Sequence, residues 1–493
     1  MGSINAAFSI MSGALNADQA ALNIVANNVA NANTTGYTRE IPNWSENTPI
    51  NISGTFVGTG VTETGATSVR DRVLEQRLDQ QQQLASASGA RLSALNLIQV
   101  LFTPASGSSS STAGDIGSDI TGFFNSFSAL AADPSNSALR GKVLSTASTL
   151  AGDVSNAAAG LNAQRSALDQ QTSSVVDQVN TLTGVIAQLN RQIQSSSPNA
   201  DAGILEDQRQ QDLSQLSQLI GINQVKTENN GLSITTESGQ LLAASGTSYQ
   251  LTSGTVNGVT HFFLGTTDVT AQLTSGGGSL GGILTARDQD IPNVMASLDQ
   301  LAYSVSTQVN AQNNKGADTT GATGAPVAGS TTGAMTLDIF SPPPTLVANQ
   351  APGPIDVTGS AANMSVVMSD STQIAAAEFG KGTGDNKNAL AMADLGGTAK
   401  AIVNGQAPSA FYSSFVTSLG STVSAVQTEN TAQNASVSQL QTQNDALSSV
   451  NLNDEASSMT MLERSYQAAS QVFAMLNTVM ASALNLGEQT TVS

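Results

Sequence analysis

Apolar residues near the N-terminus recur at alternating spacings of three and four residues. This heptad pattern is typical of a helix that presents one narrow apolar seam to another helix. Asp18 interrupts the pattern and is the only charged residue before Arg39. Asparagines that compete for backbone partners follow, and Gly36 tolerates a positive φ, so we expect the helix to end near Gly36. The seam consists of Ile4, Phe8, Met11, Leu15, Leu22, Val25 and Val29.

The C-terminal segment repeats this alternation and carries no charge between Ser465 and Gly487. A lone helix with so narrow a seam buries too little surface to offset its ordering cost. Each large side chain buried between two helices contributes about 2 kcal/mol, so we expect the two ends of the chain to pair. An ordinary antiparallel pair that closes one domain would show the same pattern. The second seam consists of Leu452, Met459, Leu462, Tyr466, Ala469, Phe473, Leu476, Met480 and Ala483.

The longest heptad run lies in the interior, where apolar residues recur every seven positions from Val154 to Leu189. Val179, Ile186 and Ile193 form a second row, which predicts a coiled-coil-like helix of about ten turns. Apolar residues at helical spacing also predict helices at 69–102, 120–130, 202–220, 284–313 and from residue 408 onward.

Two stretches lose the helical period and carry turn signals instead. Asn230-Gly231 and Asn257-Gly258 favour type I′ hairpin turns, so a small β domain is expected within 221–282. The fold class is therefore mainly α with β inserts, paired terminal helices and a long coiled-coil-like helical layer. We predict four parts: 1–36 with 452–493 as an inner helix pair; 37–220 with 283–314 and 396–451 as a helical middle domain; 221–282 as a β insert; and 315–395 as a second insert of loops and strands.

Composition narrows the function classes. Asp plus Glu number 36 against 17 for Lys plus Arg, and the net charge of −19 disfavours nucleic-acid binding. The chain has no cysteine, so disulfides and thiol chemistry are excluded. It shows neither a secretory signal pattern nor a run of eighteen apolar residues, so no membrane span is expected. If the protein works outside the cell, we expect it to leave by a route that needs no cleaved signal.

The sequence contains few residues that could form a catalytic site. His261 is the only histidine and lies in a predicted strand, where a surface or packing role is expected. Glu206 and Asp207 are adjacent on a predicted helix and should point in different directions, with Arg209 as an ordinary surface partner. Neither a nucleophile elbow nor a phosphate-binding loop is present. The sequence therefore predicts a protein that is not an enzyme and has no cofactor, catalytic residue or metal site.

The segment Ala26–Arg39 reads ANNVANANTTGYTR. It is similar to the N-terminal signature of the bacterial flagellar axial proteins of the rod, the hook and the hook–filament junction. A heptad helix at each end is that family's hallmark, and the two helices pair in the assembled tube. The residues that carry the signature are Asn27, Asn28, Asn31, Asn33, Gly36 and Tyr37.

Interior segments resemble the hook-associated protein 1 family within this class. The similar segments are LEDQR at 205–209, GGSLGGIL at 277–284 followed by Arg287-Asp288, DNKNALA at 385–391, SVNLNDEA at 449–456 and YQAA at 466–469. They occur in the family's order over most of the chain. The Ser/Gly run at 106–112 and the region 315–350 depart from the family.

This resemblance implies a structural component that joins hook and filament and assembles through its terminal helices in a tubular lattice. The implied partners are further copies of the chain, the hook protein, the next hook-associated protein, and an export chaperone on the C-terminal helix. The implied location is the extracellular flagellum, reached by type III export. The assembly interface would consist of the N-terminal seam and Leu462, Tyr466, Phe473, Leu476 and Met480, with the chaperone at Leu462, Phe473 and Leu476.

Several alternatives remain open at this point. The chain could be the hook protein or another axial protein, although the interior segments argue against this. It could be a secreted coiled-coil adhesin whose β inserts hold a ligand, or a cell-wall hydrolase carried on an axial scaffold.

Overall fold

The computed structural model describes residues 2–52, 54–103, 115–195, 202–328, 334–343 and 356–489. Within these ranges, the side chains of residues 2–5, 52 and 483–489 are not described. The chain forms two compact units. Unit 1 contains Met1–Ser86, Val175–Gly278 and Ala432–Ser493, and unit 2 contains Ala87–Ser174 and Ser279–Thr431. These boundaries differ from the predicted four parts, and that finer division stays a prediction.

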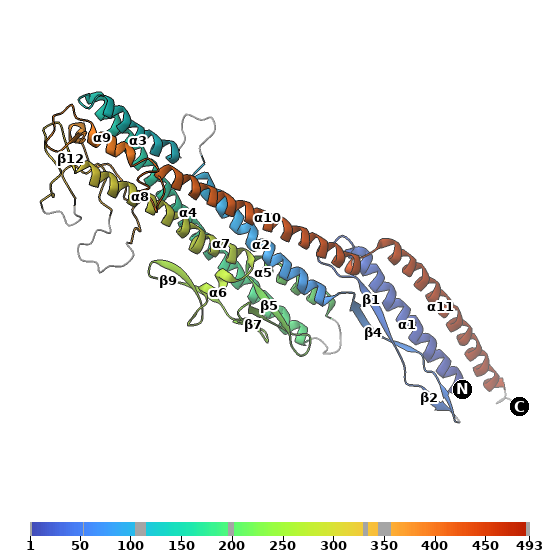
Figure 1. Ribbon diagram of the computed structural model, residues 1–493. Coiled ribbons are helices and arrows are strands. Elements are labelled where there is room, and N and C mark those ends of the chain that lie inside the picture. Colours follow the sequence, from blue (N-terminus) through green and yellow to red (C-terminus); the bar gives the residue numbers. More distant parts are fainter. Residues whose placement is uncertain are drawn as a thin grey trace. The chain divides into compact units, whose positions relative to one another are not determined.

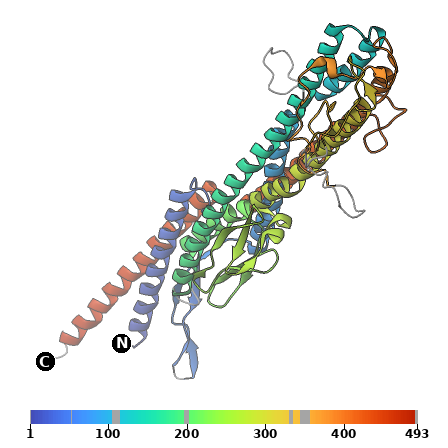
Figure 2. The same ribbon diagram turned by 90° about the vertical axis from the view of Figure 1, so that its left-hand side faces the viewer.

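The terminal helices of unit 1 lie side by side. Helix α1 (Gly2–Asn31) and helix α11 (Leu452–Gln489) run antiparallel, and both chain ends lie at the same end of the pair (Figures 1 and 2). The predicted pairing of the two ends is confirmed. Helix α1 ends at Asn31, and Gly36 has a φ of +81° in the turn that follows.

A long β-hairpin covers another side of α1. Strand β1 (Glu40–Glu46) pairs antiparallel with β4 (Val61–Ser68), and β2 (Ile50–Ile52) pairs with β3 (Thr55–Val57) near the tip. Two glycines allow the helix and the hairpin to approach closely. A Cβ on Gly13 would lie 3.0 Å from the Val61 carbonyl oxygen, and one on Gly60 would lie 3.3 Å from the Ile10 Cα. Strand β1 is polar and lacks alternating apolar residues, so the sequence pattern gives little indication of its pairing.

The remainder of unit 1 contains two small antiparallel sheets. Strands β5 (Ile222–Lys226), β6 (Leu232–Thr236), β7 (Leu241–Ala244) and β8 (Thr247–Ser248) form one sheet in sequence order. Strands β9 (Leu251–Val256), β10 (Val259–Leu264) and β11 (Thr267–Asp268) form the other, and α6 (Thr270–Ser275) follows. Asn230 and Asn257 adopt positive φ in the connecting turns, as the Asn-Gly signals predicted.

Three helices contribute to unit 1 and continue into unit 2. They are α2 (Arg72–Val100), α4 (Ser137–Ser195) and α10 (Pro408–Ser448). Helix α4 is the predicted coiled-coil-like helix, and its heptad residues Val154, Leu161 and Leu168 are buried. Helix α5 (Gly203–Leu219) belongs wholly to unit 1.

Unit 2 packs its helices around a cluster of aromatic rings. Phe123 makes edge-on contacts with Phe124, Phe127 and Phe340, with ring centroids 5.1–5.5 Å apart. The predicted helix at 284–313 is instead α7 (Gly278–Thr285), a π-helical turn η1 (Ala286–Asp290) and α8 (Ile291–Asn313). The other elements of this unit are α3 (Ile116–Ala132), β12 (Gly316–Ala317), η2 (Ser371–Gln373), β13 (Ala377–Glu378) and α9 (Lys387–Asp394).

The elements establish the predicted fold class, which is mainly helical with small β inserts. The Ser/Gly run at 106–112 lies outside the described residues. None of the helices in the described part of the chain is long and apolar enough to cross a membrane.

Candidate functional site

The contact between α1 and α11 is held at both of its ends. Near the start of α1, the ring of Phe8 lies 4.3 Å from that of Phe473, measured between centroids. Near its end, Asn28 Nδ2 donates to Glu455 Oε2 over 3.2 Å. Between these two ends, the buried residues of α1 include the small Ala17 and Ala21. The helices can therefore approach closely along their length.

The buried line on α1 is shifted from the predicted seam. It follows Ala17, Ala21, Val25 and Asn28, which recur at helical spacing. The physical reason is that α1 has two partners, α11 and the β1–β4 hairpin, so the side that both partners cover becomes the most buried. Val29 belongs to the predicted seam but is 40% exposed.

The other predicted interface residues lie at intermediate depth in this chain. Phe473 shows that their side of α11 faces α1. Tyr466 is 37% exposed, and the side chain of Ile4 lies outside the described residues. The half-buried members are Phe8, Met11, Leu15, Leu22, Leu462, Phe473, Leu476 and Met480.

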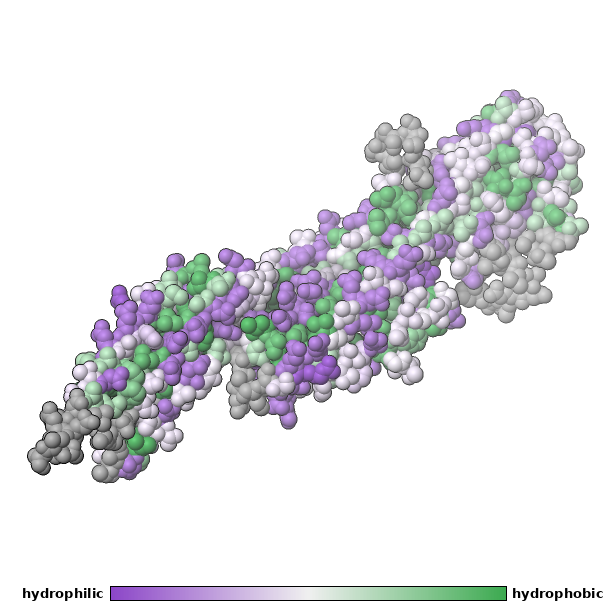
Figure 3. Space-filling view, turned by 180° about the vertical axis from the view of Figure 1, so that it is seen from behind, coloured by the Kyte–Doolittle hydropathy of each residue, from purple (hydrophilic) through white to green (hydrophobic). Residues whose placement is uncertain are grey.

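A second apolar row on α11 stays open. Met461 is 72% exposed, Met475 60% and Val479 51%, and Val472 lies on the same row. These residues, with Ala468, repeat at heptad spacing on the side next to the row that faces α1. We call this set the open row. Apolar surface is visible on the end of unit 1 that carries the terminal helices (Figure 3). Sequence reasoning missed the open row because one seam accounted for the periodicity, although the uncharged stretch from Ser465 to Gly487 was a signal for two.

The signature residue Asn28 joins four segments of the chain. Its Nδ2 donates to the Glu40 carbonyl oxygen (2.8 Å) and to Glu455. Its Oδ1 accepts from the Glu40 backbone N–H (3.0 Å) and from the Tyr37 hydroxyl (2.9 Å). Asn28 is 1% exposed, so its side-chain amide makes its full set of hydrogen bonds with protein groups in a site that solvent does not reach.

Glu455 supplies the other half of this junction. Its carboxylate is 1% exposed and accepts from Arg39 Nε over 2.6 Å as well as from Asn28. The Arg39 backbone N–H donates to the carbonyl oxygen of Ser448, at the end of α10. Sequence reasoning did not single out Arg39 or Glu455. Their signal is that Arg39 is the first cation of the chain and Glu455 lies in the first turn of the C-terminal helix.

Tyr37 is held in its neutral form. Burial, together with the nearby carboxylates of Glu40, Asp207 and Glu455, raises its pKa to about 12. The hydroxyl therefore keeps its proton and can donate to Asn28 at every physiological pH.

The remaining signature residues shape the turn after α1. Asn31 Nδ2 donates to the backbone and side-chain oxygens of Asn27, and its Oδ1 accepts from the Thr34 hydroxyl. The backbone of Gly36 is in the left-handed region, where a Cβ would be strained. Asn33 is exposed.

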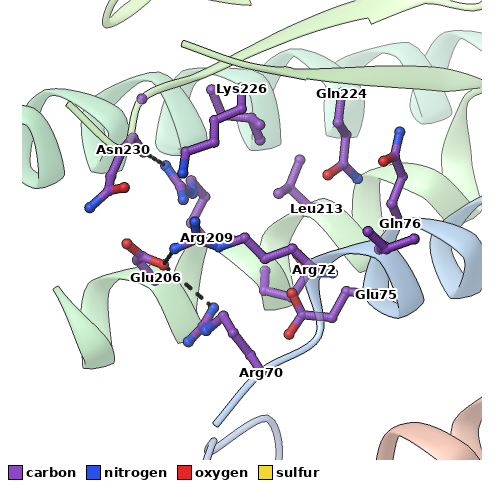
Figure 4. Close-up of a pocket in the computed structure, with 14 residues that line it drawn as sticks. Arg70, Arg72, Glu75, Gln76, Glu206, Arg209, Leu213, Gln224, Lys226 and Asn230 are labelled. Atoms are coloured by element: carbon purple, nitrogen blue, oxygen red, sulfur yellow. Dashed lines mark hydrogen bonds and ion pairs between the residues drawn. The ribbon is translucent and has the colours of Figure 1, made fainter. Parts of the chain in front are cut away.

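Glu206 and Asp207 do not form the ordinary surface pair with Arg209 that the sequence suggested. Glu206 is 1% exposed, accepts from Arg72 over 2.7 Å and lies 3.9 Å from Arg70 (Figure 4). Asp207 pairs with Arg70 and accepts from the Thr38 backbone N–H. The acidic pair thus fastens α5 to the segment before α2 and to the signature turn. The prediction was wrong because helical spacing does not show which element covers a helix face.

His261 lies on β10 and its Nδ1 is 2.7 Å from Asp268 Oδ2. No group of three or more His, Asp or Glu side chains that could hold a metal ion occurs within the described ranges. The junction around Asn28 and Glu455 positions helices, because its hydrogen bonds join α1 to β1 and to α11.

Known proteins match both the N-terminal segment and the interior of the chain. Residues 9–38 match the family of flagella basal body rod proteins, and residues 107–327 match the family described as the flagellar hook-associated protein FlgK helical domain. Flagellar hook-associated protein 1 of Escherichia coli (strain K12) is 26% identical and aligns over 97% of this chain and 98% of its own length. The same-named protein of Bacillus subtilis (strain 168) is 25% identical over 96% of each chain.

A solved structure shares the fold. The flagellar hook junction protein FlgK from Burkholderia pseudomallei superposes with a TM-score of 0.62 at 20% identity, covering 75% of this chain and 99% of that one.

The paired terminal helices and the match at residues 9–38 define a flagellar axial protein. Within that class, the match at 107–327 and the relatives that align over nearly the whole chain indicate which axial protein this chain resembles. The chain is similar over nearly its whole length to the flagellar hook-associated protein 1 of these bacteria. It is a structural protein and not an enzyme, which removes the hydrolase alternative.

Proposed function

We propose that this chain is the structural subunit that joins hook to filament in a bacterial flagellum, and that it does so through the open row of α11. The observation that carries the proposal is a helix that has no charge from Ser465 to Gly487 and carries two apolar rows, of which its own chain covers one. A helix that is apolar on several sides is stable when it is surrounded. Copies that pack in a tube supply that surrounding.

The junction around Asn28 gives this packing its geometry. Phe8 and Phe473 fix the two helices at one end, and Asn28, Glu455 and Arg39 fix them at the other. A pair held in this way presents its open row at a defined angle. The predicted seam residues then act within each copy, as the contact that holds α1 on α11, and the open row acts between copies.

As a flagellar component, the chain assembles with hook and other axial proteins outside the cell. We infer that copies of this chain form a ring. The hook protein lies on one side of that ring, and the next hook-associated protein lies on the other side. An export chaperone would bind α11 before α1 pairs with it, when Leu462, Phe473 and Leu476 are uncovered. Covering them would prevent aggregation of an apolar helix face.

Charges introduced on the open row test the proposal. The double substitution Val472→Asp and Met475→Asp should leave the isolated chain folded, because both side chains are exposed. It should block incorporation into flagella, since each packed copy would bury uncompensated carboxylates. Ala474→Asp is the matched control, because Ala474 is exposed on a different side of α11.

The measurement is the amount of the chain in isolated flagella, with circular dichroism of the purified variants as the folding check. Wild-type incorporation by the doubly substituted chain would show that the open row is not an interface.

A further inference from the structure

A cavity of about 160 Å³ in unit 1 gathers positive charge in an acidic protein. It is lined by Arg70 just before α2, by Arg72 at the first position of α2, by Arg209 from α5 and by Lys226 from β5. Four of the chain's 17 lysine and arginine residues thus line one cavity, although the net charge is −19. Their side chains extend from three elements around Glu206 (Figure 4).

The carboxylates at the cavity do not balance these cations. Glu206 is bound to Arg72 and Arg70, and Asp207 outside the lining is bound to Arg70. Glu75 is the other acidic residue of the lining, and burial raises its pKa to about 7, so it is partly protonated at neutral pH. The cavity therefore keeps an excess of positive charge.

Two of the cations have no carboxylate partner in the part of the chain that the structure describes. Arg209 is 8% exposed, and its Nη1 donates to Asn190 Oδ1 (2.9 Å) and to the Asn230 carbonyl oxygen (2.8 Å). Burial lowers its pKa. The nearby Glu206 and Glu75 oppose this shift, and Arg72 and Arg70 add to it by repulsion. Lys226 is exposed at the rim, and neither an ion pair nor a hydrogen bond reaches its ammonium group from the described residues.

The buried end of the cavity also contains a donor without an acceptor. The Arg70 side chain is 6% exposed, and its Nε has no hydrogen-bond partner among the described residues. A buried donor left without a partner costs about 1–3 kcal/mol, and an oxygen-rich ligand would satisfy it. The buried Glu206 Oε1, which likewise lacks a partner there, can accept from a protonated ligand oxygen or from water.

We propose that this cavity is a binding site for a compact oxyanion. Guanidinium groups match the planar oxygen pairs of carboxylate and phosphate groups, and a cavity of about 160 Å³ holds one such group. The oxyanion is either a free phosphate ion or the carboxylate of an Asp or Glu side chain from a second copy of this chain. The inference stands on the cavity alone and does not depend on the role of the open row.

The test compares thermal unfolding in phosphate and in chloride at equal ionic strength, with inorganic phosphate as the probe. The variant is Lys226→Gln, and the matched control is Lys142→Gln, which removes an exposed lysine from α4 in unit 2. Phosphate stabilises folded proteins in general by exclusion from their surface, and the control variant measures that effect. We expect wild type and Lys142→Gln to gain the same stabilisation from phosphate and Lys226→Gln to gain less. In calorimetric titration, Lys226→Gln should weaken phosphate binding by about fivefold.

Equal stabilisation of all three proteins, or none beyond chloride, would overturn the proposal. Sedimentation velocity then separates the two sources of the oxyanion. If a second copy supplies a carboxylate, phosphate should weaken self-association and so should Lys226→Gln. If the ligand is a free ion, neither change should alter self-association.

Discussion

At the residue scale, the axial-protein signature is a set of hydrogen bonds that fixes where two helices meet. The Asn28 side chain makes four hydrogen bonds. Two go to the backbone of Glu40, one to the Tyr37 hydroxyl and one to the Glu455 carboxylate, so they join α1 to three other segments. The sequence pointed to Asn28 and Tyr37 only through resemblance. Nothing in the local pattern shows that an exposed-looking asparagine would be buried, because its partners Glu40 and Glu455 lie on other elements.

Asn28→Ala should therefore loosen the terminal helix pair. It leaves Glu455 with one fewer donor and the Tyr37 hydroxyl without its acceptor, so we expect a loss of about 2–4 kcal/mol in local stability. Hydrogen exchange of the α1 and α11 amides measures this loss. Asn33→Ala changes an exposed residue of the same signature and should alter protection by less than about 0.5 kcal/mol. Equal effects of the two substitutions would contradict the role given to Asn28.

Glu75 should make stability depend on pH. Burial raises its pKa from 4.5 to about 7, so between these values the folded chain holds a proton that the unfolded chain has lost. Stability from this group consequently increases as the pH falls from 8 toward 5 and is lost as the pH rises through about 7. The change amounts to about 2–3 kcal/mol. Asp79, whose pKa burial raises to about 6, acts with the same sign.

Thermal unfolding at pH 8 and pH 6 checks this prediction. Glu75→Gln should be more stable than wild type at pH 8 and should gain less on acidification. Glu46→Gln, which changes an exposed carboxyl, should keep the wild-type pH dependence. Identical pH profiles for wild type and Glu75→Gln would rule out a buried, proton-binding Glu75.

At the scale of the elements, the heptad periods predicted the helices and their pairing but did not identify every buried position of α1. The pattern identified α1, α4 and α11 because the spacing of apolar residues follows from helix geometry alone. Of the predicted seam, Val25 is buried and Val29 is 40% exposed, and the structure also buries Ala17 and Ala21, which the seam did not include. A seam prediction assumes one partner. The hairpin β1–β4 is a second partner of α1, and the polar sequence of β1 gives no sign that it packs against this helix.

The small residues at this contact should not accept larger ones. Ala21→Leu places three extra carbon atoms at a fully buried position, so we expect a loss of about 1–3 kcal/mol in the stability of the helix pair. Ala26→Leu adds the same atoms at an exposed position of the same helix and should be neutral or slightly stabilising. Limited proteolysis that follows release of residues 2–31 measures the difference. Equal resistance of both variants would mean that α1 is not packed through Ala21.

At the scale of the whole molecule, sequence and structure answer different questions. The order of the segments LEDQR, GGSLGGIL and YQAA along the chain was enough to suggest the family, because segment order does not require knowledge of any contact. Burial within the folded chain was not predictable in the same way. Glu206 reads as a solvated helix residue and is in fact buried against Arg70 and Arg72, and the open row on α11 became visible only once α1 had covered the other row.

Electron microscopy of cells that lack this chain tests the junction role most directly. The account predicts hooks of normal length without filaments, together with flagellin released into the medium. Wild-type chain and the Ala474→Asp variant should restore filaments, and the chain with Val472→Asp and Met475→Asp should not. Filaments of normal length and number on cells that lack the chain would contradict the account.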